Sequence, residues 1–155
     1  MSTVNGKRVI AGGVVAGLVA LVAEVLMEPV AGGPMQTWLS GLGIEPPGEI
    51  TMLGYLVTAI VLGIVMVWLY AAARPRLGAG PSTALRIGLA VWALACAIPN
   101  IHMFGLGVMP ADLFWIITLG TAVQMPLAAL AGAWVYREES AAPARGGVPS
   151  HAAHV

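Results

Sequence analysis

Four long apolar segments constrain the fold of this chain more than any other feature of its sequence. They cover Val9 to Val30, Met52 to Ala73, Thr83 to Phe104 and Leu113 to Tyr136. Each has the length of about 20 residues that a helix needs to cross a hydrocarbon core about 30 Å thick. Backbone groups inside a bilayer must be hydrogen-bonded within their own segment, which a helix achieves. We therefore expect an all-α, polytopic membrane protein with four transmembrane helices.

The composition supports this class. Of the 155 residues, 59% are hydrophobic and only 9% are charged, whereas a soluble domain carries about 25% charged residues. The formal net charge is zero, so nothing points to nucleic acid as a partner. The lone cysteine, Cys96, excludes an internal disulfide and a cysteine-based metal cluster. We predict no metal and no cofactor.

The positive charges predict an orientation. All of them lie before the first segment, between the second and third, or after the fourth: Lys7, Arg8, Arg74, Arg76, Arg86, Arg137 and Arg145. The other two connections carry Glu45, Glu49 and Asp112 instead. Since lysine and arginine favour the cytoplasmic side, we expect both termini there. A cleaved signal peptide is the alternative for the N-terminus, although Glu24 interrupts its apolar run.

The connection on the inner, positively charged side contains Arg74, Arg76 and Arg86. These side chains either bind anionic lipid headgroups or serve only to set the topology. Pro75 is expected to end the second helix, and Ser82 to cap the third. The sequence after Glu139 is small and unpatterned, so we predict a single domain at 1–138 and a disordered cytoplasmic tail at 139–155.

The long outer connection contains a helical pattern of its own. In "GGPMQTWLSGLG", apolar residues recur at i, i+3, i+4 and i+7, between Pro34 and Gly43. This pattern predicts a short interfacial helix that lies flat on the outer membrane surface, with Trp38 at headgroup level. The alternative is that the segment packs as a cap over the bundle.

Two carboxylates stand in the first apolar segment, one helical turn apart. On a helix, Glu24 and Glu28 share a stripe with Gly13, Gly17 and Ala20. Small residues let a neighbouring helix approach closely, so this stripe is expected to pack against other helices and to turn Glu24 inward. Glu28 lies at the outer boundary. A charge near the bilayer centre costs at least about 2.5–3.5 kcal/mol, so Glu24 needs polar partners or a proton.

Candidate partners lie on the other three segments. Gln124 and Thr121 lie near Pro126 in the fourth, Asn100 and His102 follow Pro99 in the third, and Thr58 lies in the second. Prolines that interrupt helices next to polar residues often mark a buried site. We predict a polar pocket in the outer half, built from these side chains and Glu24. The alternative is a hydrogen-bond network that only fixes helix packing.

Three phrases, "VWLYAAARPRLGAGPSTAL", "GLAVWALA" and "PLAALAGAWVYRE", resemble those of a group of small, functionally uncharacterised four-helix bacterial inner-membrane proteins. The likeness covers roughly residues 9–138. It implies a bacterial inner (plasma) membrane location and the same four-helix layout, and it implies nothing about chemistry.

Two functions remain open. The first is a small integral membrane protein without enzymatic activity, a self-assembling or accessory subunit of a membrane complex. Its expected partners are the lipid bilayer and further copies of the chain or other membrane subunits. The second is a small proton-linked transporter or carrier that uses Glu24 as its titrating group. An intramembrane enzyme has no support, because the segments contain no Ser–His pair, no HExxH motif and no paired aspartates.

Overall fold

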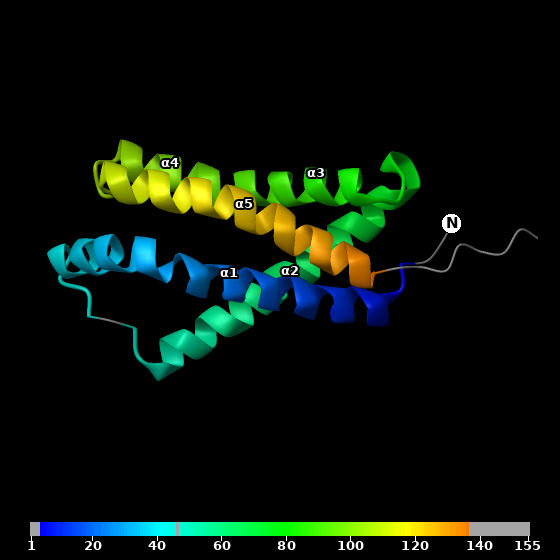
Figure 1. The fold of residues 1–155 in the computed structure, drawn as a ribbon, viewed down its shortest axis with the longest axis horizontal. Helices are drawn as coiled ribbons and strands as arrows, with labels where there is room; N and C mark the ends of the chain where they lie inside the picture. The colour runs from blue at the N-terminus through cyan, green and yellow to red at the C-terminus, as the bar shows by residue number, and fades with distance from the viewer. Residues whose placement is uncertain (1–3, 46, 137–155) are drawn as a thin grey trace, which may run out of the picture.

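A computed structural model describes residues 4–45 and 47–136 (Figure 1). Its elements are α1 (Gly6–Gly41), α2 (Glu49–Leu77), α3 (Pro81–Trp92), the π-helical turn η1 (Ala93–Ala97), α4 (Ile98–Gly105) and α5 (Ala111–Val135). There is no strand among these described residues. The predicted tail at 139–155 lies outside them.

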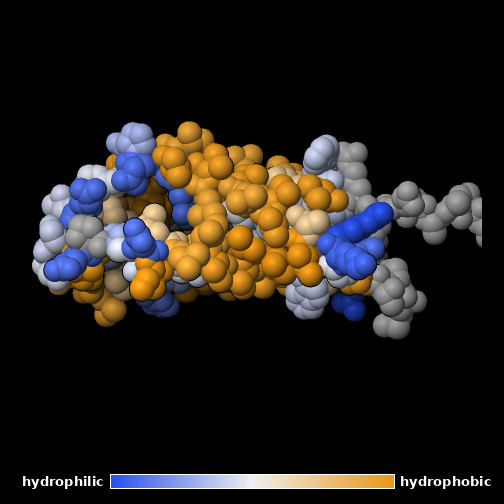
Figure 2. All heavy atoms as spheres, turned by 90° about the horizontal axis from the view of Figure 1, so that it is seen from below, coloured by the Kyte–Doolittle hydropathy of each residue, from blue (hydrophilic) through white to orange (hydrophobic). Residues whose placement is uncertain are grey.

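The structure contains four helices that are long and apolar enough to cross a membrane: α1, α2, the continuous run Pro81–Gly105, and α5. Figure 2 shows an apolar belt along the middle of the molecule, with hydrophilic surface towards both ends. The expectation of an all-α chain with four long apolar helices is therefore confirmed.

The two ends of the bundle differ in charge. At one end α1 begins, α2 turns into α3, and α5 ends (Figure 1). We call it the basic end, because it carries Lys7, Arg8, Arg74, Arg76 and Arg86. The opposite end, which we call the acidic end, carries Glu45, Glu49 and Asp112. The charge pattern of the sequence thus becomes a separation along the length of the bundle.

Close backbone contacts hold α1 between two neighbours, α2 and α5. At the crossing with α2, a Cβ atom added to Gly63 would lie 2.6 Å from the nitrogen of Gly17 and would also meet the carbonyl oxygen of Gly13. On the side of α5, a Cβ added to Gly12 would lie 2.7 Å from the carbonyl oxygen of Gly132. Only glycine allows helices to approach this closely.

The prediction of a separate interfacial helix was wrong, because α1 continues through Pro29 and Pro34 to Gly41 without a break. The end of α1 packs onto the start of α5. The Trp38 indole Nε1 donates a hydrogen bond to the Val108 carbonyl at 2.6 Å, and Met35 packs against a cluster that includes Leu113. These contacts fit the alternative, in which the segment covers the bundle, and they offset the backbone hydrogen bonds that the prolines cannot make.

The turn between α2 and α3 also differs from the prediction. Pro75 lies inside the last turn of α2, which ends at Leu77, and the cap of α3 is Gly80 rather than Ser82. The Thr83 hydroxyl donates to the carbonyls of Leu77 and Gly78, at 3.2 and 2.9 Å. Thr83 thereby provides a hydrogen-bond donor for carbonyls at the end of α2, which have no partner within that helix. Its position inside α3 is not one at which sequence rules for helix caps expect such a residue.

Candidate functional site

Near the acidic end, α2 leaves the bundle. Every residue from Pro47 to Thr58 is exposed, whereas α2 packs closely against α1 from Ala59 towards the basic end. Figure 1 shows the first half of α2 diverging from α1 and α5. Seen from the side of α2, the surface is hollowed near the acidic end (Figure 2). We call residues 49–58 of α2, together with Glu24 and Glu28 of α1, the open face.

Glu24 lies on the helix face that packs against α2 nearer the basic end. Gly13 and Gly17 contact α2 on this face, and Glu24 follows Gly17 after two turns. The face is therefore directed towards the bundle as predicted, but the Glu24 side chain is exposed because α2 has already diverged at this level. The expectation that packing covers Glu24 is wrong for the isolated chain.

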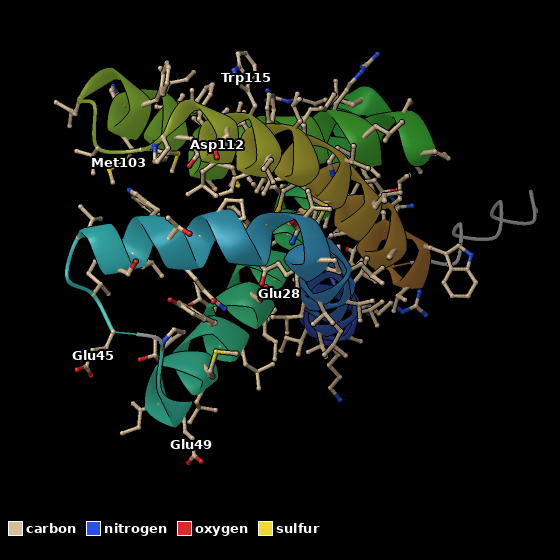
Figure 3. The ribbon with its side chains drawn as sticks, turned by 60° about the vertical axis from the view of Figure 1, so that its left-hand side comes forward. Glu28, Glu45, Glu49, Met103, Asp112 and Trp115 are labelled. Carbon is tan, nitrogen blue, oxygen red and sulfur yellow. The ribbon has the colours of Figure 1, made fainter. Side chains whose placement is uncertain are left out.

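Glu28 lies one turn closer to the acidic end and is also exposed. Figure 3 shows its side chain on the side of α1 that is turned towards α2, whereas Glu45 and Glu49 point away from the bundle. A Cβ added to Gly32 would meet the Glu28 carboxylate, which folds back over this buried glycine. The two carboxylates of α1 thus both belong to the open face.

Cys96 of η1 and Thr121 of α5 are both half-buried. The Cys96 thiol interacts with the Thr121 hydroxyl, and the Glu24 carboxylate is near enough to act on the thiol electrostatically. Cys96 belongs to a π-helical turn, which precedes Pro99. A π turn widens the helix and gives room for a proline ring that clashes with an α-helical carbonyl. The thiol and the hydroxyl thus join η1 to α5, and Glu24 acts on the thiol only at a distance.

Gln124 contacts α1, but its partner is a backbone carbonyl and not the predicted Glu24 carboxylate. Its side-chain Nε2 donates to the backbone carbonyl of Ala20 at 2.8 Å, and the side chain is buried at 4% exposure. Ala20 lies one turn from Glu24 towards the basic end. Gln124 therefore joins α5 to the α1 backbone, which supports a packing role for this residue.

Asn100 belongs to a separate cluster around Thr118 of α5. Its Nδ2 lies 3.3 Å from the Thr118 hydroxyl, and the Trp92 indole donates to the Thr118 carbonyl at 3.1 Å. The Thr121 hydroxyl donates to the carbonyls of Ile117 and Thr118, at 2.7 and 3.2 Å. The sequence interpretation missed Thr118 and Trp92, although Thr118 lies one turn before Thr121 on the same segment.

Two predicted members of the pocket lie elsewhere. His102 is exposed on α4, because residues two positions apart point to different sides of a helix and Asn100 faces α5. Thr58 is exposed on the diverging half of α2, where its hydroxyl donates to the Gly54 carbonyl of its own helix at 2.8 Å. The predicted pocket is thus divided into Glu24 on the open face, the Cys96–Thr121 contact, the Gln124 contact and the Thr118 cluster.

Replacing Gln124 with leucine tests the packing role of the amide. We expect a loss of about 0.6–2 kcal/mol in the free energy of unfolding, because one interhelical hydrogen bond disappears while the volume is nearly kept. Unfolding in mild detergent, followed by tryptophan fluorescence, measures the change. Gln36→Leu is the control, since Gln36 is exposed on α1. Equal effects of the two substitutions would contradict the role of Gln124.

The fold and the site together define a class: an all-helical protein with four helices able to cross a membrane, and a carboxylate on its open face. Searches of protein-family models, curated proteins and solved structures find no match to this chain.

Proposed function

We propose that this chain is an integral membrane protein without enzymatic activity, and that it assembles with another membrane-spanning segment at its open face. The observation that carries this proposal is the exposed Glu24 carboxylate, at mid-length on an apolar helix, beside the level at which α2 leaves α1. A charge exposed to acyl chains is costly. A partner helix with a hydrogen-bond donor or a cation at this depth removes that cost.

The exposed half of α2 supports the same proposal. Leu53 lies seven residues before Ile60, which contacts α1 at Gly17, so both side chains lie on the same side of α2. Leu53 is 61% exposed. The helix surface that packs against α1 near the basic end therefore continues uncovered towards the acidic end, where a further helix fits between α1 and α2.

We also propose where the protein lies in the cell and how it is oriented in the membrane. The separation of basic and acidic ends supports insertion with the basic end and both termini in the cytoplasm. A bacterial plasma membrane agrees with the resemblance described above. Reporter fusions at the C-terminus and in the connection at residues 42–48 distinguish this orientation from its inverse.

Photo-crosslinking in native membranes tests the docking role. We expect a photoreactive residue at Leu53 to form an adduct with one defined protein, either a second copy or another membrane subunit. Leu119 is the matched control, because it is 59% exposed and lies on α5, outside the residues of α1 and α2 that define the open face. Adducts of the same pattern at both positions, or with lipid alone at Leu53, contradict the proposal.

A carrier is the second candidate, and Glu24 favours it. An exposed carboxylate on an apolar helix, on a face hollowed near the acidic end, is the feature of this chain that a carrier would use. In proteoliposomes a carrier loses its flux when glutamine replaces Glu24, whereas a docking subunit has no flux in either form.

A further inference from the structure

The basic end contains a groove that is separate from the open face. Its walls are apolar side chains from the start of the chain, the end of α2 and the turn to α3, among them Val4, Ala72 and Ala79. Among the described residues that line it, Arg74 and Tyr136 are the polar ones. Apolar walls with a cation beside them match a molecule that is itself part apolar and part anionic.

Aromatic rings position Arg74 at this groove. The guanidinium carbon lies 6.0 Å from the ring centroid of Tyr70 and 5.6 Å from that of Tyr136. The two rings pack edge to face, with centroids 6.2 Å apart, and they are 5% and 2% exposed. Contact with the two rings holds the guanidinium at the groove, and its planar array of N–H donors is suited to an anionic oxygen.

The groove is built on an ordered turn. The Tyr70 hydroxyl accepts a hydrogen bond from the Gly80 backbone N–H at 3.2 Å, and Thr83 bonds the carbonyls at the end of α2. These bonds connect α2 to the start of α3 across the turn that contains Ala79. The wall of the groove therefore exists before any ligand binds, which lowers the cost of binding.

The electrostatics of this end favour an anion. Lys7, Arg8, Arg74, Arg76 and Arg86 lie there, and Arg137 follows the described residues in the sequence. The carboxylates of Glu45, Glu49 and Asp112 lie at the opposite, acidic end. An anionic headgroup is attracted to such an end over about a Debye length.

We propose that this groove binds an anionic phospholipid of the adjacent leaflet, with the phosphate at Arg74 and the glycerol and first methylenes along the apolar wall. The apolar lining, and the place of the groove at the end of the membrane-spanning helix α2, favour a lipid over a free phosphate. The proposal separates the arginines of the inner connection: Arg74 lines the groove, while Arg76 and Arg86 are exposed outside its lining.

The test uses the full chain in mild detergent, with phosphatidylglycerol, phosphatidylcholine or glycerol 3-phosphate added. We expect phosphatidylglycerol alone to raise the melting temperature and to remain bound in native mass spectrometry. In Arg74→Gln the affinity for phosphatidylglycerol falls about fivefold, as expected for one charged contact at a membrane surface. Arg86→Gln is the matched control: it removes the same charge outside the lining, so its affinity falls less than that of Arg74→Gln. Arg74→Lys keeps more affinity than Arg74→Gln.

Ala72→Trp provides a second test that leaves every charge in place. Ala72 is exposed and lines the groove, so a larger side chain fills the space without touching the core. We expect this variant to lose the stabilisation by phosphatidylglycerol even if Arg74→Gln does not fold. Equal losses in Arg74→Gln and Arg86→Gln, unchanged binding in Ala72→Trp, or equal stabilisation by glycerol 3-phosphate would each overturn the proposal.

Discussion

Replacing Gly63 with leucine is expected to separate α1 from α2 and to cost more than about 3 kcal/mol in the free energy of unfolding. A Cβ at this position would lie 2.6 Å from the nitrogen of Gly17 and would also collide with the carbonyl oxygen of Gly13. Both obstacles are backbone atoms of a helix, which cannot rotate away as a side chain can. The helices must therefore move apart, and the neighbouring contacts of Gly13 and Gly17 with α2 are lost as well.

Gly54→Leu is the matched control on the same helix. An added Cβ there meets nothing within 4 Å, and leucine is the better helix former. We expect Gly54→Leu to leave stability unchanged or slightly higher. Unfolding of both variants in mild detergent, followed by tryptophan fluorescence and circular dichroism, gives the comparison. If Gly63→Leu proves as stable as Gly54→Leu, the close crossing of α1 and α2 is wrong.

Glu24→Leu is expected to have opposite effects on insertion and on assembly. Removing a carboxylate from mid-length of an apolar helix should make insertion of the segment at residues 9–30 more favourable by about 2.5–3.5 kcal/mol. The same change should abolish the adduct at Leu53, because the partner loses the group that it recognises. A residue that opposes insertion but is required for assembly shows a trade-off between stability and function.

Glu28→Leu distinguishes this role from a general effect of charge. Glu28 lies one turn nearer the acidic end, with its carboxylate folded over Gly32. It should therefore change insertion less than Glu24 does and leave the adduct at Leu53 in place. Apparent insertion free energies in microsomal membranes and photo-crosslinking in cells measure the two effects. If Glu24→Leu leaves the adduct intact, Glu24 has no part in docking.

The sequence predicted three of the four long helices within a few residues, because hydrophobic length is a property of each segment alone, whereas α1 continues beyond the predicted end at Val30 to Gly41. Local corrections arose where tertiary contacts override a local rule. Pro34 does not begin a separate helix but lies inside α1, whose end is held by the bond from Trp38 to Val108. Pro99 does not break its helix, since η1 absorbs the strain one turn earlier.

The candidate site was predicted less completely. The stripe of small residues predicts that Glu24 lies on a helix face that packs against the bundle, but no local pattern shows that α2 stays apart from α1 before Ala59. The predicted hydrogen-bond partners of the polar residues were also inaccurate. The depth of a residue in the membrane and its helix face show which residues can come near one another, but they do not show which atoms form a hydrogen bond. Gln124 bonds a backbone carbonyl, and Asn100 bonds Thr118, a residue with no conspicuous sequence signal.

The bond from Gln124 to the Ala20 carbonyl has a consequence for how this contact changes during evolution. Every residue carries a carbonyl, so any amino acid small enough for position 20 preserves the acceptor. The register between α1 and α5 at this point thus depends on the identity of one side chain only. Related chains should then keep glutamine at position 124 while position 20 varies freely among small residues, without the correlated substitutions by which contacts are usually detected.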